Sequence, residues 1–131
     1  MFTQERLLGR VLAIDGTTTS LVDLFTGETG MRIMVTKIVV RLTAWLGVSS
    51  AMHVSFGNNA TTYDNWKQDF DTKLTGSQQY IVVNFDPASG SASQMIEPTD
   101  HFQMKINTGA TADVYGVGID VWGYSLDVAH T

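Results

Sequence analysis

The chain contains no cysteine, two prolines and few basic residues for a length of 131 residues. Without cysteine it has no disulfide framework, no thiolate nucleophile and no cysteine-ligated zinc. Thirteen acidic residues against eight basic ones give a net charge of −5. A nucleic-acid-binding protein needs a basic footprint to displace phosphate counterions, and no apolar run approaches the roughly 18 residues of a membrane-spanning helix. We therefore expect neither a nucleic acid nor a membrane as partner.

The size and the start of the chain suggest one domain made in the cytoplasm. Domains typically have about 100–150 residues, so 1–131 is expected to form a single domain. Hydrophobic residues make up 44% of the chain and charged residues 16%, a balance that favours a folded core over disorder. Residues 1–6 lack the apolar stretch of a secretory signal peptide, so we expect a protein that is made and used without secretion.

The composition favours β structure throughout. Valine, isoleucine and threonine greatly outnumber leucine, and their branched side chains suit a pleated strand better than a helix. Apolar residues at every second position, together with this bias, predict strands at 7–14, 21–25, 33–46, 52–56, 80–85, 101–107 and 114–126. A hairpin-type turn at 15–17 is expected to join the first two strands. In the last strand the inward side is expected to switch faces at Gly123.

One segment, 61–74, breaks the period of two. Asp64 stands where it could cap a short helix. Apolar side chains follow at spacings of three and four residues: Tyr63, Trp66, Phe70 and Leu74. This spacing predicts one or two helical turns across an end of the sheets. The predicted fold is all-β: an antiparallel, jelly-roll-like β-sandwich of about seven to eight strands with at most one short helix.

No motif with catalytic or metal-binding spacing is present. His53 and His101 lie on the polar faces of their predicted strands, without the spacing of a zinc site. Asp69 and Asp71 form a D-x-D pair but lack the rest of a calcium loop. We therefore predict no catalytic residue, no metal ligand and no cofactor, and expect that the protein is not an enzyme. A small hydrolase that uses aspartate and histidine from loops is the least favoured alternative.

Exposed aromatic rings are the first candidates for an interaction surface. Tyr80 lies opposite the apolar face of its predicted strand, and Tyr63 and Trp66 lie near a turn. Such rings on a β-sandwich anchor protein interfaces or pack in the core more often than they bind sugar. We therefore predict interface roles for these three residues.

The N-terminal residues 1–10 are the second candidate. Phe2, Leu7 and Leu8 are apolar in a segment that has no clear strand phase. Such an arm could dock on a neighbouring subunit, where contacts offset the cost of ordering it. The alternative, an edge strand of the same domain, is equally open.

Together these segments resemble a known class of proteins. A long strand rich in valine and threonine at 35–43 is followed by a short strand that ends in glycine at 54–57. An aromatic loop comes next at 63–66, and the chain closes on an alternating strand with Trp-Gly-Tyr at 122–124. This pattern resembles small β-sandwich virion proteins of tailed bacteriophages, most of all head decoration (cement) proteins.

The resemblance implies a structural protein. Such a protein would bind the lattice of the major capsid protein on the capsid exterior, commonly as a homotrimer, and stabilise the shell. It would be made in the host cytoplasm. The alternative is a receptor- or carbohydrate-binding β-sandwich of a phage tail or fibre, which would use the exposed rings at Tyr63, Trp66 or Tyr80.

Overall fold

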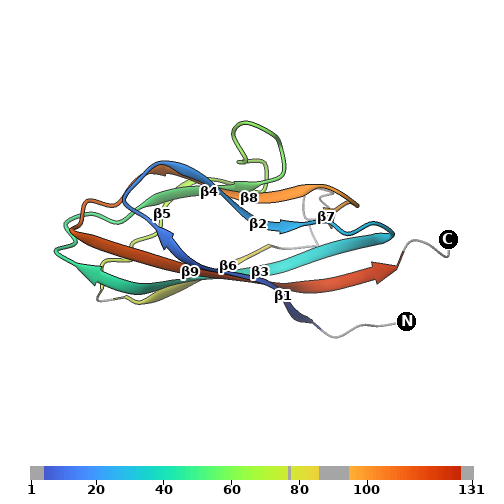
Figure 1. Ribbon diagram of the computed structural model, residues 1–131, viewed down its shortest axis with the longest axis horizontal. Helices are drawn as coiled ribbons and strands as arrows, with labels where there is room; N and C mark the ends of the chain where they lie inside the picture. Colours follow the sequence, from blue (N-terminus) through green and yellow to red (C-terminus); the bar gives the residue numbers. More distant parts are fainter. Residues whose placement is uncertain (1–4, 77, 86–94, 128–131) are drawn as a thin grey trace.

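The computed structural model describes residues 5–76, 78–85 and 95–127 (Figure 1). All regular secondary structure in these ranges is β-strand, so they contain no helix that could cross a membrane. The strands are β1 (Arg6–Asp15), β2 (Ser20–Thr26), β3 (Met31–Leu46), β4 (His53–Gly57), β5 (Lys67–Asp71), β6 (Tyr80–Asn84), β7 (Met95–Ile96), β8 (His101–Thr108) and β9 (Val114–Asp127).

The strands form two antiparallel sheets that pack face to face. Sheet A has the order β1-β9-β3-β6, with the short β7 also paired to β3, and sheet B has the order β2-β8-β4-β5. Figure 1 shows the two layers, with β9, β3 and β1 in one and β4, β8 and β2 in the other. Apart from β7, this is the strand order of a jelly roll, so the predicted fold class is confirmed.

The turn after β1 does not make the hairpin that the sequence suggested. β1 pairs with β9 in sheet A, whereas β2 pairs with β8 in sheet B. The turn therefore carries the chain from one sheet to the other, and the backbone N–H of Gly16 donates to the carbonyl of Tyr115 at 2.9 Å. The crossing lets Ile14 and Leu24 bury their side chains in the same core from opposite layers.

The helical turns expected within 61–74 are also wrong. The segment forms a loop and then β5, in which Phe70 pairs with Val54 of β4. The backbone N–H of Trp66 donates to the carbonyl of Phe56 at 3.1 Å, which fixes the loop against the neighbouring strand. The apolar spacing therefore reflects side chains anchored from a loop and a strand, a pattern that helical periodicity imitates over a short stretch.

β9 keeps one inward face along its described length. Tyr115, Val117, Ile119 and Val121 are buried as predicted, and Gly123 continues the alternation, so the expected switch is wrong. The irregularity at this level lies in the neighbouring strands. The register of β1 skips Leu8 and that of β3 skips Thr36. A side chain at position 123 would overlap the carbonyl oxygen of Met34, so only glycine allows the two backbones to approach so closely.

The core between the sheets contains a cluster of aromatic rings. Phe56 from β4 and Phe102 from β8 are fully buried, and their ring centroids lie 6.4 Å apart. Phe85, just after β6, meets both rings edge-on. Trp66 covers the cluster from the loop before β5, with its ring 4.4 Å from that of Phe102. This cluster joins both sheets and the loop into one core.

Candidate interface surfaces

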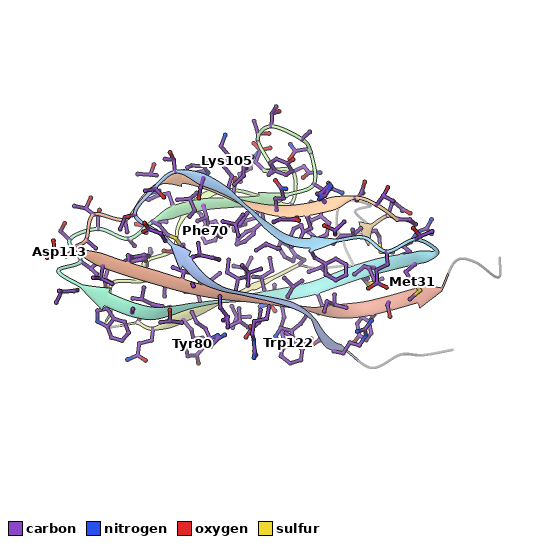
Figure 2. All side chains as sticks on the ribbon, in the orientation of Figure 1. Met31, Phe70, Tyr80, Lys105, Asp113 and Trp122 are labelled. Atoms are coloured by element: carbon purple, nitrogen blue, oxygen red, sulfur yellow. The ribbon has the colours of Figure 1, made fainter. Side chains whose placement is uncertain are left out.

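The outward side of sheet A, which we call the A face, contains several exposed apolar residues. Paired residues in antiparallel strands share a face, so Leu7 lies beside Trp122, and Val82 lies beside Val39. Figure 2 shows Tyr80 and Trp122 pointing away from sheet B. Leu12 is 59% exposed, Tyr80 60% and Val82 44%. Single exposed apolar residues are common, but a group on one sheet face indicates a surface that binds another molecule.

Charged side chains on the A face are held in place by ion pairs. The carboxylate of Asp120, whose side chain is only 9% exposed, accepts from Arg10 Nε at 2.7 Å and lies 3.3 Å from Arg41 Nη2. The hydrogen bond that Arg10 donates to Asp120 also raises the pKa of Arg10. Lys37 lies 5.5 Å above the ring of Trp122 and 3.3 Å from Glu5. The arginines are therefore fixed before any partner arrives, which lowers the entropic cost of binding.

The arginines are distributed unevenly between the two sheets. All four arginines of the chain lie on strands of sheet A: Arg6, Arg10, Arg32 and Arg41. The outward side of sheet B, which we call the B face, is instead polar, and Figure 2 shows Lys105 pointing away from the sandwich there. Asn107 donates to Asp69 at 2.8 Å on this side. The two faces thus differ in chemistry, with apolar and arginine side chains on one and hydrated polar groups on the other.

The two histidines of the B face do not meet. His53 pairs with Thr108 at one end of β8, whereas His101 pairs with Thr26 at the other. The ring of His53 has one nitrogen 3.8 Å from Asp69 and the other 3.8 Å from Asp71. Within 5–76, 78–85 and 95–127, no group of three or more histidine, cysteine, aspartate or glutamate residues has a metal-binding arrangement.

The loop before β5 is organised by Asp64. Its carboxylate accepts from Asn59 Nδ2 at 2.7 Å and from Thr62 Oγ1 at 2.9 Å, and its backbone N–H donates to Asn59 Oδ1. The buried hydroxyl of Ser55 donates to the carbonyl of Thr62. Asp64 therefore closes the loop over the B face and does not cap a helix.

We expect this loop to loosen in acid. Hydrogen bonds from Asn59 and Thr62 lower the pKa of Asp64 from its ordinary value of 3.8. Because the pKa of Asp64 is lower in the folded protein, its ionised carboxylate stabilises the loop fully at any pH above the ordinary value. This stabilisation is lost as the pH falls through the lowered pKa of the folded protein. Titration followed by the NMR shifts of Asp64 and the Asn59 amide should therefore have its midpoint below 3.8. A midpoint at or above that value would contradict the hydrogen bonding described here, and Asn59→Ala should move it upward.

The structure separates the aromatic residues that the sequence singled out. Tyr80 is exposed on the A face. Tyr63 is half-buried, and Trp66 packs on the aromatic cluster while its Nε1 donates to Asn58 at 3.3 Å. The three rings therefore do not form one exposed platform on which a sugar could stack.

The N-terminal candidates belong to an edge strand. Residues 6–10 form part of β1, which pairs with β9. For these residues the edge strand, and not a free arm, is therefore observed. Leu7 lies on the A face, whereas Leu8 packs against the core. Phe2 lies outside the described residues.

Sequence reasoning missed several exposed apolar residues of the A face, among them Val82 and Leu12. Val82 is two residues from Tyr80 in β6 and therefore points to the same side of the sheet. The sequence indicated this, because β6 has apolar residues at both odd and even positions. Leu12 lies in a bulge of β1, next to Ala13 with φ 60°, and the bulge breaks the alternation that would place its side chain.

Comparisons with known proteins give a fold. No family model matches the chain, and no curated protein matches it. A chain in the acid-stable capsid of Helicobacter pylori bacteriophage KHP30 has a TM-score of 0.53 at 13% identity, over 95% of this chain and 98% of that one. A chain in the capsid asymmetric unit of cyanophage Pam1 has a TM-score of 0.53 at 10% identity, over 88% of this chain and 80% of that one. The shared feature is the fold.

Proposed function

We propose that this chain is a structural capsid protein of a tailed bacteriophage, and specifically a decoration protein that binds the major capsid protein lattice and stabilises the shell. One observation carries the proposal. The sandwich aligns with nearly the whole of a chain from one phage capsid and with most of a chain from another. A small β-sandwich of this kind therefore accounts for nearly all of one chain and most of another in solved phage capsid structures. The protein has no catalytic role and no cofactor in this proposal.

The A face is the surface that we propose docks on the capsid exterior. It combines exposed apolar side chains and the aromatic rings of Tyr80 and Trp122 with arginines held by Asp120. Aromatic and arginine side chains are enriched at the centres of protein interfaces, whereas lysine and acidic residues are depleted. The polar B face would then be left to face solvent. Assembly as a homotrimer, after synthesis in the host cytoplasm, is part of the same proposal.

Binding to empty shells tests this function. Purified protein is mixed with expanded capsid shells that lack it, and the pelleted shells are analysed for bound protein and for thermal stability. Saturable, stoichiometric binding with a higher shell melting temperature is expected. Absence of saturable binding would reject the proposal, and binding to host polysaccharide instead would favour the receptor-binding alternative.

A matched pair of leucine variants tests which face docks. Leu12 on the A face and Leu21 on the B face are 59% and 51% exposed, so an aspartate at either position should fold normally. Leu12→Asp would place an unpaired charge within the interface and should weaken shell binding by about tenfold or more. Leu21→Asp should bind like the wild type. Equal effects of the two variants, or a larger effect of Leu21→Asp, would show that the A face is not the docking side.

A further inference from the structure

Strand β6 is an unusual edge of the sandwich. The other edge strands of five or more residues are β1, β2 and β5, and each contains charged residues and an irregularity in its pairing. β6 pairs with β3 without any bulge, and Tyr80–Asn84 contains neither a charge nor a proline. Proteins normally protect exposed edges with charges, prolines or bulges, because a regular edge is a template for another strand. Among the described edge strands of this length, β6 is the one without such protection, since β7 has only two residues.

The hydrogen bonds to β3 show which backbone groups of β6 are free. The N–H of Leu42 donates to the carbonyl of Gln79, and the N–H of Phe85 donates to the carbonyl of Thr36. Because bonding alternates along an antiparallel strand, the N–H and C=O groups of residues 80, 82 and 84 point away from β3. The Gln78 side chain donates to the carbonyl of Tyr80 at 3.1 Å, so this carbonyl points outward and an added strand would replace Gln78 as its partner.

A cleft of about 540 Å³ opens below this edge, between β6 and β5. Phe70 and Ile81 give it apolar walls. Two lysines and one acid, Lys67, Lys73 and Asp71, line it as well, so its charged lining is basic on balance. Lys67 Nζ lies 5.2 Å above the ring of Phe70. Within the described part of the chain, neither lysine forms an ion pair with a carboxylate. A strand added beside β6 would direct every second side chain toward this cleft.

We propose that the free edge of β6 binds an extended segment of a partner protein in which two kinds of residue alternate. Its carboxylates would point toward Lys67 and Lys73 in the cleft, and its apolar residues would extend the A face beside Tyr80 and Val82. The edge supplies the backbone hydrogen bonds, and the cleft selects the side chains, as in other cases of strand addition. A second copy of this chain fits less well, because β6 paired with β6 would bring the lysines of both copies to one seam. The inference goes beyond the proposed function and does not depend on it.

One substitution removes the free edge without touching the β3 ladder. The N–H of Val82 points outward, so Val82→Pro deletes an edge donor and leaves the bonds to β3 intact. Val82→Ala is the matched control, since it removes the same side chain but keeps the N–H. Should the proline variant fail to fold, Lys67→Glu combined with Lys73→Glu tests the charge preference on an intact edge.

The probe is a synthetic octapeptide in which valine alternates with glutamate, compared with one in which valine alternates with lysine. The glutamate peptide should bind and protect the amides of residues 80, 82 and 84 from hydrogen exchange. The lysine peptide should bind the wild type about tenfold more weakly than the glutamate peptide does. The glutamate peptide should bind Val82→Pro about tenfold more weakly than it binds the wild type, and should bind Val82→Ala about as well as the wild type. The double glutamate variant should reverse the peptide preference.

Any of three results with the peptide would overturn the inference: no binding of the glutamate peptide at millimolar concentration, equal binding to Val82→Pro and wild type, or protection elsewhere in the chain. Protection of the same amides in concentrated protein without peptide would identify a second copy as the occupant, which also overturns it. The two proposals fail separately. If wild-type protein does not bind shells, the capsid function is rejected while the peptide result decides the strand site.

Discussion

Replacement of Phe102 by alanine is expected to lower the free energy of unfolding by about 3–5 kcal/mol. The side chain is fully buried in the aromatic cluster. Its ring lies 4.4 Å from that of Trp66, 6.2 Å from Phe85 and 6.4 Å from Phe56. Because these neighbours come from separate strands and a loop, they cannot all move inward to fill the space, and a cavity should remain. The loss is therefore expected near the upper end for a core truncation.

Urea unfolding followed by tryptophan fluorescence measures this loss, since Trp66 lies in the cluster. Tyr80→Ala is the matched control, because it removes a ring of similar size from an exposed position. Its effect should stay within about 0.5 kcal/mol. If Phe102→Ala were as mild as Tyr80→Ala, the cluster would not be the centre of the core, and the packing of the two sheets would have to be revised.

The strands could be predicted from the sequence wherever one face of the strand is buried. In β8 the alternation of Phe102, Met104 and Ile106 with polar residues matches the burial, and β3 and β9 follow the same rule. Burial of one face imposes a period of two that no other local structure produces over such lengths. In β3, the many β-branched residues further favour a strand over a helix.

The connections between strands could not be predicted in the same way. A turn with aspartate and glycine at 15–17 suits a hairpin, yet here it joins strands of different sheets. The choice depends on which strand offers a free edge after folding, which is a tertiary property. The segment 61–74 failed for a similar reason, because the contact of Trp66 with Phe102 fixes a loop whose apolar spacing resembles a helix.

The candidate surface was predictable only in part. The alternation in β6 correctly predicted that the ring of Tyr80 points to solvent. The composition of the A face, however, depends on the register between strands that are distant in the sequence. Asp120 meets Arg10 and Arg41, which are 110 and 79 residues away along the chain. No local pattern identifies such a trio. The bulge at Leu12 likewise becomes visible only when β1 is aligned with β9.

The close approach of β9 and β3 leads to the other large expected effect, that of Gly123→Ala. A Cβ at this position would overlap the backbone carbonyl oxygen of Met34 and would lie 2.9 Å from Leu8 Cδ1. A backbone oxygen cannot retreat without opening the β9–β3 ladder, so we expect a loss of about 3 kcal/mol or more, or failure to fold.

Gly118→Ala on the same strand is the control for this effect. Its nearest neighbour would be Leu12 Cδ2 at 3.2 Å, the end of an exposed side chain that can move aside. Glycine is also unfavourable in a strand interior, so alanine at 118 should change the stability by less than about 1 kcal/mol. Thermal unfolding of both variants measures the difference. Equal melting temperatures would mean that β9 does not lie against Met34 in the register described, and the outward positions of Asp120 and Trp122 that define the A face would no longer follow.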